Sequence, residues 1–279
     1  MELVERLAVS SITFRDEPLA TAAARVRRLG FTRLDLTAIR HYCDHVDPLL
    51  VDVGEEECAR VRALLDAAGL QTVSLTGYPA NPLARDLNGD DWAEGMDAYV
   101  RLGIALGAET LVLPPGHPAP AADRWRGTAE RALPWQREAV RRAQAGHLTP
   151  AFALQSDSLL RTAAEGAVFL PLLKLPGAGL AVDPAHLAAV NDDPVDALRA
   201  LGDTVAFVVL RDTDRYDYNL PPGDGELDYP AILAALEAIR YAGPLVLAVD
   251  DVSLPPEERE ARLQQGRAYL EGYAQRKAA

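Results

Sequence analysis

Short apolar runs and amphipathic stretches alternate along the whole chain. The runs are rich in Val and Leu, as is typical of strands buried on both faces of a parallel sheet. They span Leu7–Ile12, Phe31–Leu36, Gln71–Thr76, Glu109–Leu113, Ala151–Gln155, Gly179–Asp183, Val205–Leu210 and Leu245–Asp250. Between them, apolar residues recur three or four positions apart, as at Leu19, Ala22, Val26 and Leu29, which predicts helices with one buried face. The pattern predicts eight strands and eight helices in alternation.

Glycines mark the ends of the predicted helices at an average interval of about 36 residues. A left-handed residue at a helix C-terminus costs least without a Cβ atom, which explains the choice of glycine. The residues concerned are Gly30, Gly69, Gly107, Gly146, Gly177, Gly202 and Gly243. One βα unit per interval is what a (β/α)8 TIM barrel of roughly 250 residues requires. We therefore predict an α/β fold, with a single TIM barrel domain over residues 1–279.

Local signals refine the predicted helices and loops. Asp16 is placed to cap the first helix, and Asp228 precedes Tyr229-Pro230, a helix start with proline in its first turn. Residues 114–126 are rich in Pro and Ala and follow the fourth predicted strand. They predict a long βα loop, either part of a lid over the site or an irregular surface loop.

The charge balance excludes two classes of partner. The chain carries 41 Asp and Glu residues against 28 Lys and Arg, a formal net charge of −13, whereas nucleic acids and anionic membranes need a basic footprint. No run of about 18 apolar residues predicts a membrane span, and Met1–Ser11 lacks the apolar core of a signal peptide. Two cysteines, Cys43 and Cys58, are too few for a disulfide scaffold or a four-cysteine zinc site. We expect a cytoplasmic protein that binds neither nucleic acid nor membrane.

Lysine is scarce, and this narrows the chemistry further. Lys174 and Lys277 are the only two in the chain. Lys277 is in the C-terminal tail, and Lys174 ends an apolar stretch beside Pro176 and Gly177, a natural helix C-terminus. Because a Schiff-base enzyme needs a lysine in its pocket, a lysine-dependent aldolase is disfavoured.

The candidates for chemistry are the residues that close each predicted strand, because the site of a TIM barrel lies at that face. Asp183 stands out, since it ends an apolar strand and His186 follows three residues later. Asp183 is either a metal ligand or general base, or a cap of the next turn through the amide of Ala185 or His186.

Two further groups at the same face have alternative interpretations. The alternation of His41, Cys43 and His45 fits either a metal site or surface histidines beside a small buried cysteine. Three arginines either hold a phosphate or carboxylate of the substrate with their two-pronged fork, or pair with neighbouring aspartates. They are Arg15, Arg40 and Arg211.

Several sequence pieces occur together in an order that is typical of one family. They are “SSITFRD”, “LAVDPAHL”, “VVLRDT” and “LPPGDGELDYPAILAALEAIRYAGPLVLAVDD”. The spacing of Gly223, Gly225 and Asp228, followed by Tyr241 and Gly243, is the most specific part. Over essentially its whole length the chain resembles the xylose isomerase-like superfamily of sugar-phosphate isomerases and epimerases.

Members of this family typically hold a divalent cation with a Glu, an Asp, a His and a Glu at the ends of strands five to eight. In the epimerases the two Glu residues also move the proton. By the resemblance, the corresponding residues here are Gln155, Asp183, Val209 and Ala248. One carboxylate and one neutral amide leave at best a weak Mn, Mg or Zn site, because Val209 and Ala248 carry no donor. We expect either no cofactor or a weakly bound divalent metal on Asp183.

The resemblance implies an isomerase/epimerase-like barrel that binds a small sugar- or polyol-like ligand, with metal-dependent isomerisation reduced, altered or lost. Its catalytic candidates are Gln155, Asp183 and His186. Its substrate-binding candidates are Arg15, His117, Arg211, Asp212 and Asp250. The alternative is an active isomerase with a metal site shifted to Asp183, His186, Asp212 and Asp250. The DNA-repair endonuclease branch of the fold is disfavoured, because it needs clustered His and carboxylate ligands and a basic groove.

Overall fold

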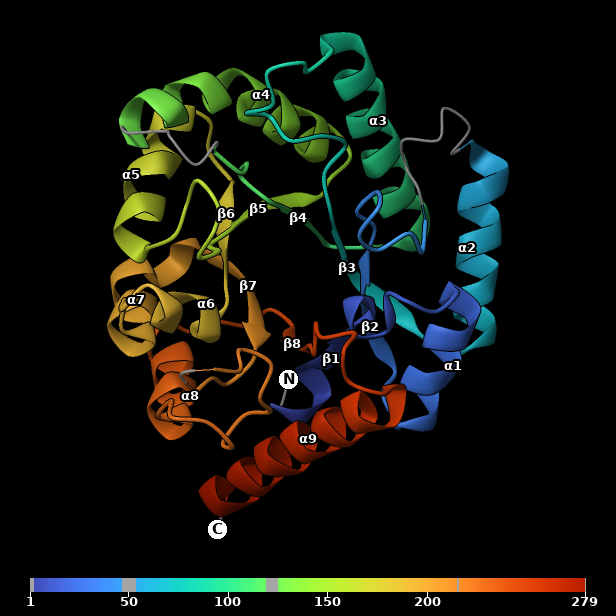
Figure 1. Ribbon diagram of the computed structural model, residues 1–279, viewed down its shortest axis with the longest axis vertical. Helices are drawn as coiled ribbons and strands as arrows, with labels where there is room; N and C mark the ends of the chain where they lie inside the picture. The colour runs from blue at the N-terminus through green and yellow to red at the C-terminus, as the bar shows by residue number, and fades with distance from the viewer. Residues whose placement is uncertain (1–2, 47–53, 119–124, 215, 279) are drawn as a thin grey trace.

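The strands close into a barrel in sequence order. A computed structural model describes residues 3–46, 54–118, 125–214 and 216–278. All neighbouring strands pair in parallel, and the last strand pairs with the first (Figure 1). The strands are β1 (Leu7–Ser10), β2 (Arg33–Thr37), β3 (Gln71–Thr76), β4 (Thr110–Leu113), β5 (Thr149–Ala153), β6 (Gly179–Val182), β7 (Val205–Leu210) and β8 (Leu245–Leu247). The predicted single-domain TIM barrel is confirmed.

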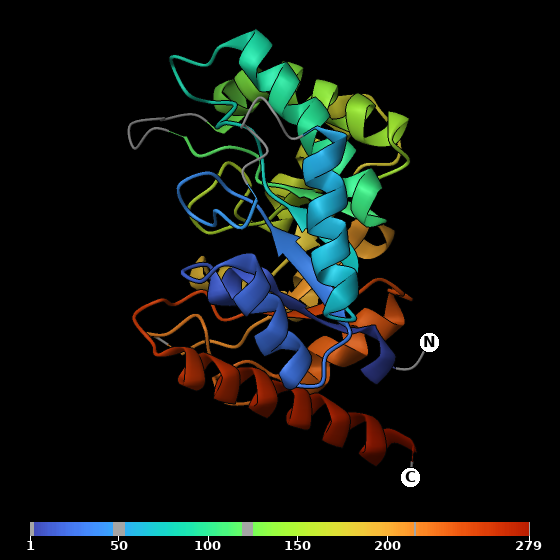
Figure 2. The same ribbon diagram turned by 90° about the vertical axis from the view of Figure 1, so that its right-hand side faces the viewer.

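Helices surround the barrel on its outside (Figure 1). They are α1 (Leu19–Arg28), α2 (Glu55–Ala67), α3 (Gly89–Leu106), α4 (Trp125–Ala145), α5 (Ala163–Leu173), α6 (Pro184–Ala189), α7 (Pro194–Leu201), α8 (Tyr229–Ala238) and α9 (Pro256–Ala278). Short 3-10 turns are η1 (Val4–Arg6), η2 (Ser11–Phe14) and η3 (Gly202–Thr204). Both chain ends lie at one side of the barrel in Figure 2. None of the helices in these ranges is long and apolar enough to cross a membrane.

Two layers of apolar side chains pack on the two faces of the barrel sheet. The outer layer joins the strands to the helices and includes Leu34 and Leu36 of β2. The inner layer fills the barrel with apolar residues, half of them alanines: Ala8, Val73, Val112, Ala151, Ala153, Ala181, Phe207 and Val246. Side chains alternate between the faces of a strand, so Asp35, between Leu34 and Leu36, belongs to the inside. Four residues of this layer also line a cavity above it: Val112, Ala153, Ala181 and Phe207.

The observed elements agree with the predicted ones, with two differences. The predicted strand bounds lie within three residues of the observed bounds, and Asp228 caps α8 through the N–H of Ala231 at 3.0 Å. One predicted helix is in fact two, α6 and α7, because Asp193 caps a new helix at Pro194. The prediction that Asp16 caps the first helix is wrong. The N-cap of α1 is Pro18, and Asp16 pairs instead with the buried Arg259 of α9 at 2.7 Å.

Left-handed residues end most of the helices, as the glycine interval predicts. Five of the seven predicted glycines have positive φ, namely Gly30, Gly69, Gly107, Gly177 and Gly202. At the other two turns His147 (φ 60°) and Arg240 (φ 56°) take this conformation in place of the neighbouring glycine. Lys174 also ends a helix, α5, with φ 54°. Of the predicted loop over residues 114–126, residues 119–124 lie outside the described ranges, and α4 begins at Trp125.

Candidate functional site

A cavity of about 520 Å³ opens at the C-terminal ends of the strands. The four positions that the resemblance assigns to the family's metal ligands all line it: Gln155, Asp183, Val209 and Ala248. Five of the other candidate residues line it as well: Arg40, His117, His186, Arg211 and Asp250. The structure thus brings residues from opposite sides of the barrel together at the face where the sequence places the site.

Asp183 has both of its carboxylate oxygens occupied by protein groups. Oδ1 accepts a hydrogen bond from the backbone N–H of Ala185 at 3.0 Å, which makes Asp183 the N-cap of α6. Oδ2 accepts hydrogen bonds from Nε of Arg211 at 2.7 Å and from its Nη2. The two side chains are only 6% and 12% exposed, so water and salt screen this pair little. The predicted cap is confirmed, and the cation in contact with Asp183 is the guanidinium of Arg211.

A hydrogen-bonded network extends from this pair along one side of the cavity. Arg211 Nη1 donates to Asn219 Oδ1 at 3.2 Å, and the same oxygen accepts the backbone N–H of Asp250 at 2.7 Å. The carboxylate of Asp250 accepts from Arg15 Nε at 2.9 Å and from the hydroxyl of Tyr42 at 2.5 Å. Arg15 also stacks over the Tyr42 ring, 4.2 Å from its centroid. Two of the predicted arginines therefore pair with neighbouring aspartates.

His186 and Gln155 lie side by side on the cavity wall. The backbone N–H of Ser156 points at Nδ1 of His186 at 3.4 Å, and its hydroxyl lies 3.1 Å away. This arrangement makes Nδ1 an acceptor and leaves the ring proton on Nε2. Burial lowers the pKa of His186, which keeps the ring neutral at pH 7. The buried Oε1 of Gln155 accepts no hydrogen bond from any described residue.

Asp212 lies outside the cavity, although it belongs to both predicted residue sets. It is completely buried. Its carboxylate accepts the backbone N–H groups of Thr213 at 2.8 Å, Gly223 at 3.0 Å and Leu227 at 3.1 Å. These bonds hold the long connection between β7 and α8. The structure therefore places the Asp212 carboxylate in the β7–α8 connection, apart from the other predicted substrate-binding residues that line the cavity.

The residues at the family's metal positions do not fit a divalent ion. Val209 and Ala248 carry no donor atom, Gln155 offers a neutral amide, and both oxygens of Asp183 are occupied. Within the described part of the chain, no group of three or more His, Cys, Asp or Glu side chains is arranged to hold a metal. Divalent ions need several anionic oxygens, or at least three N, S or O ligands for zinc.

The loop with His41, Cys43 and His45 is built around a buried hydrogen-bond chain. Nδ1 of His45 lies 3.3 Å from Cys43 Sγ and 3.1 Å from Ser11 Oγ, and Nε2 lies 3.1 Å from the carbonyl oxygen of Phe14. Burial raises the pKa of Cys43 to about 12 and lowers the pKa of His45. His41 is exposed. A protonated thiol and a neutral imidazole engaged in this way tie the loop to η2.

A polar cluster on the cavity floor contains residues that no motif pointed to. Asp35 Oδ2 accepts the hydroxyl of Ser10 at 2.7 Å and that of Thr37 at 3.4 Å. Asp35 Oδ1 accepts the hydroxyls of Ser74 and Thr76, each at 2.7 Å. All of them except Ser74 line the cavity. The available signal was a carboxylate between two leucines in the apolar strand β2. Burial raises the pKa of Asp35, and the four hydroxyl donors oppose this effect.

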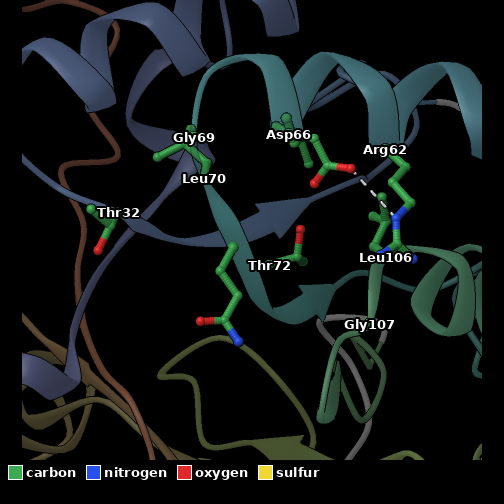
Figure 3. Close-up of a pocket in the computed structure, with 10 residues that line it drawn as sticks. Thr32, Arg62, Asp66, Gly69, Leu70, Thr72, Leu106 and Gly107 are labelled. Atoms are coloured by element: carbon green, nitrogen blue, oxygen red, sulfur yellow. Dashed lines mark ion pairs between the residues drawn. The ribbon is translucent and has the colours of Figure 1, made fainter.

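A second cavity of about 520 Å³ lies at the opposite end of the barrel, between the amino ends of β2, β3 and β4 (Figure 3). Its charged side chains are Arg62 and Asp66 of α2, which form an exposed ion pair at 3.6 Å. The backbone of Gly69–Gln71 and the turn at Gly107 supply much of the remaining surface. The two cavities therefore have the same volume. They differ because buried polar side chains converge in the cavity at the C-terminal ends of the strands.

Comparisons with known proteins agree with this fold. A family model described as “xylose isomerase-like TIM barrel” matches residues 23–273. Among curated proteins none matches the chain.

Many solved structures share the fold, and three represent them. A D-allulose 3-epimerase from Methylomonas sp. is 17% identical, with a TM-score of 0.77 over 96% of this chain and 97% of that chain. A 3-keto-D-glucoside 4-epimerase from E. coli is 16% identical, with a TM-score of 0.75 over 96% and 99%. The IolI protein, solved with a bound zinc atom, is 14% identical, with a TM-score of 0.74 over 95% and 97%. At these identities the likeness extends to the fold.

Proposed function

Because the chain belongs to the xylose isomerase-like TIM barrel family, we propose that its C-terminal cavity binds a small sugar- or polyol-like ligand without a divalent metal. Metal-dependent isomerisation of the kind found in the family is then reduced, altered or lost. The family membership supports the ligand class, and the epimerases among the similar structures act on sugars. The contacts inside the cavity support the absence of the metal.

The observation that carries the proposal is the ion pair between Arg211 and Asp183. Family members use this Asp as a metal ligand, but here its Oδ2 accepts Arg211 Nε at 2.7 Å. A guanidinium carries a permanent positive charge, so Arg211 balances the Asp183 carboxylate without a metal ion from solution. A buried pair of this kind resists disruption, because removal of one partner strands an uncompensated charge. A divalent ion would have to displace Arg211 while gaining a single carboxylate.

The internal pairing of Asp183 and Asp250 favours an uncharged, polyhydroxylated ligand. Asp183 and Asp250 are each paired with an arginine, so neither presents an unbalanced charge to a ligand. The Oε1 of Gln155 is a buried acceptor without a donor among the described residues. Buried polar atoms are almost always hydrogen-bonded in folded proteins, so this oxygen calls for a donor such as a ligand hydroxyl.

Metal analysis combined with ligand titration tests the proposal. We expect the protein, purified and dialysed against EDTA, to contain well below one equivalent of Mn, Mg or Zn. We also expect D-allulose, D-tagatose or D-sorbitol to bind this EDTA-treated protein, as measured by isothermal titration calorimetry. The affinity should be unchanged when Mn²⁺ is added, because the described residues contain no group of three or more His, Cys, Asp or Glu side chains arranged to hold it.

Two outcomes would overturn the proposal. Stoichiometric metal that survives dialysis and is lost in Asp183→Asn would show that the metal site persists. Failure of all three probes to bind the wild-type protein would remove the ligand class. A matched control is Asp66→Asn at the opposite end of the barrel, where an exposed pair with Arg62 lines the other cavity.

A further inference from the structure

The floor of the cavity carries a cluster of one carboxylate and several hydroxyls on β1, β2 and β3. The strand register puts Ser10 beside Asp35 and Asp35 beside Ser74. Parallel neighbours lie roughly 5 Å apart and point to the same side, so the barrel itself brings these side chains into hydrogen-bond distance. Thr37 and Thr76 form the next pair along the same two strands. The cluster is therefore a product of the fold's register and not of a flexible loop.

The cluster belongs to different strands from the family's metal positions. Gln155, Asp183, Val209 and Ala248 follow β5 to β8, whereas Asp35 and its hydroxyls belong to β1 to β3. None of the hydrogen bonds of the Arg211 and Asp250 network includes Asp35. The cavity thus has two independent polar regions, and the floor region does not depend on a metal.

A comparison of two buried aspartates shows what kind of group Asp35 is. Asp212 is fully buried and Asp35 is 2% exposed. Asp212 accepts three backbone N–H groups, which can only donate. Asp35 accepts side-chain hydroxyls, which can rotate and either donate or accept. The backbone N–H donors around Asp212 cannot reorient. The hydroxyl groups around Asp35 can reorient when a ligand enters the cavity.

We propose that Ser10, Asp35, Thr37 and Thr76 form a subsite that binds neighbouring hydroxyl groups of an uncharged polyol or sugar. The inference rests on the proposed function, since it specifies how the same cavity holds its ligand. When the hydroxyls donate to Asp35, their oxygens remain acceptors on the cavity side, and a ligand hydroxyl is a matching donor. Hydrogen bonds in such a chain polarise one another, which strengthens the outer acceptors.

The same cluster disfavours an anionic group at this end of the ligand. A phosphate or carboxylate on the floor would face the Asp35 carboxylate, and the surrounding hydroxyls already donate to that carboxylate. Like charges at short range in a poorly solvated site are strongly unfavourable. The subsite therefore selects the uncharged, hydroxyl-bearing end of its ligand.

Three substitutions in calorimetric titrations with D-allulose, D-tagatose and D-sorbitol test this subsite. Asp35→Asn keeps the shape but replaces one acceptor oxygen by a donor, and should weaken binding at least about tenfold. Thr76→Val and Ser74→Ala are a matched pair. Each deletes one 2.7 Å hydrogen bond to the same oxygen, Asp35 Oδ1, but of these two residues only Thr76 lines the cavity. Thr76→Val should weaken binding about fivefold and Ser74→Ala less than about twofold.

The outcomes separate this inference from the function on which it rests. If no probe binds the wild-type protein, the proposed function fails and the subsite fails with it. If a probe binds and Asp35→Asn binds it as tightly as the wild type, the subsite is wrong while the sugar-binding cavity stands. Equal losses in Thr76→Val and Ser74→Ala would also overturn the subsite, because they would show an effect through Asp35 alone. Circular dichroism of each variant confirms that the compared proteins are folded.

Discussion

The two walls of the C-terminal cavity differ in the chemistry they present. On β1 to β3 the side chains that line the cavity include hydroxyls and a carboxylate, such as Ser10, Asp35 and Thr76. On β5 to β8 the corresponding strand positions are small or apolar: Ala153, Ala181, Phe207, Val209 and Ala248. The ends of β6 to β8 carry charge, but there aspartates and arginines neutralise one another.

The difference locates the polar side chains of the barrel interior on β1 to β3. In the family, by resemblance, the metal site is supplied by the ends of strands five to eight, which here carry two apolar residues and an internal ion pair. The barrel register on the other side still converges four hydroxyls on one buried carboxylate. A shared fold therefore does not imply a shared catalytic wall, and function has to be argued from the side chains present.

The largest expected effect is the restoration of a metal site on the apolar wall. The variant Gln155→Glu/Val209→His/Ala248→Glu adds two carboxylates and one imidazole around Asp183, which completes a four-ligand set suited to Mn²⁺ or Zn²⁺. We expect Mn²⁺ to bind at least about a thousandfold more tightly than to the wild type, about 4 kcal/mol. Calorimetric titration with MnCl₂ measures the change.

A matched control for this prediction is the same triple variant with Asp183→Asn. The extra substitution removes the carboxylate that the family uses at strand six, and it should return the affinity for Mn²⁺ most of the way to the wild-type value. If the triple variant gains no affinity, Arg211 holds Asp183 too firmly for a metal to compete, or the wall geometry is not that of the family. Either result would weaken the comparison of the two walls.

The second effect separates the two buried aspartates by stability. Asp212→Asn replaces an acceptor by a donor that faces backbone N–H groups, which cannot turn away, so we expect a loss of about 2–3 kcal/mol in the free energy of unfolding. Asp35→Asn meets hydroxyls that can rotate to accept, so its cost should stay below about 1 kcal/mol. Urea denaturation at pH 7 measures both. Equal losses would mean that Asp35 is as structural as Asp212.

The pH dependence of Asp35→Asn has a definite sign. Burial raises the folded-state pKa of Asp35 above the ordinary value of about 3.9. The ionised carboxylate is therefore less favourable in the folded than in the unfolded chain, and the wild type loses stability as the pH rises through the raised pKa. The Asn variant cannot ionise there. Its stability relative to the wild type should be highest near neutral pH and should decline toward pH 4.

Sequence patterns predict the barrel and one wall of the site, and the reason is local. Alternating apolar runs predict β1 to β8, and Asp183 at the end of a predicted strand is found on the cavity wall as an N-cap. The polar floor is harder to predict, because it depends on strand register. Ser10, Asp35 and Ser74 are far apart in the chain and meet only through β1–β2 and β2–β3 pairing. A charged residue in an apolar strand was the one local sign.

The sequence offers arginine–aspartate pairing as one of two alternatives, and the choice of partners stays open for a related reason. Arg211 and Asp183 lie 28 positions apart, and their mutual contact depends on how β6 and β7 sit next to one another. Asp212 follows Arg211 directly, yet its side chain turns to the β7–α8 connection and not to the cavity. A shift of one position at the end of a strand therefore decides whether a charged side chain points into the cavity or away from it.

The third effect concerns two histidines, one near each wall: the buried His45 and the half-buried His186. Burial lowers the pKa of His45, which contacts η2 beside β1, and of His186, which follows β6. The unfolded chain binds a proton near the ordinary value of about 6.5, whereas the folded chain does not. The stability contributed by the neutral rings is complete above pH 6.5 and is lost as the pH falls toward the folded-state values. Each ring contributes a slope of up to about 1.4 kcal/mol per pH unit.

Substitution of each histidine shows how much of this pH dependence of the free energy of unfolding comes from each ring. Denaturation curves between pH 7.5 and 5 should become flatter in His45→Gln and in His186→Gln, since each variant lacks one titrating ring. In the double variant the two reductions in slope should be additive, because the two rings belong to different hydrogen-bonded groups. An unchanged slope in either single variant would show that its ring titrates at the ordinary value, contrary to its burial.

The smallest expected effect lies at the opposite end of the barrel, in the cavity of Figure 3. Arg62 and Asp66 are 57% and 65% exposed and 3.6 Å apart, and exposed pairs of this kind contribute little because water and salt screen them. Arg62→Ala also removes an exposed hydrogen bond from Nη1 to the carbonyl oxygen of Ala105 at 2.7 Å, and it should change the free energy of unfolding by less than about 1 kcal/mol. It should leave the binding of D-allulose, D-tagatose and D-sorbitol unchanged. A loss of sugar binding in Arg62→Ala would move the ligand to this cavity, because the two cavities have the same volume and are distinguished only by the buried polar groups that converge in the other.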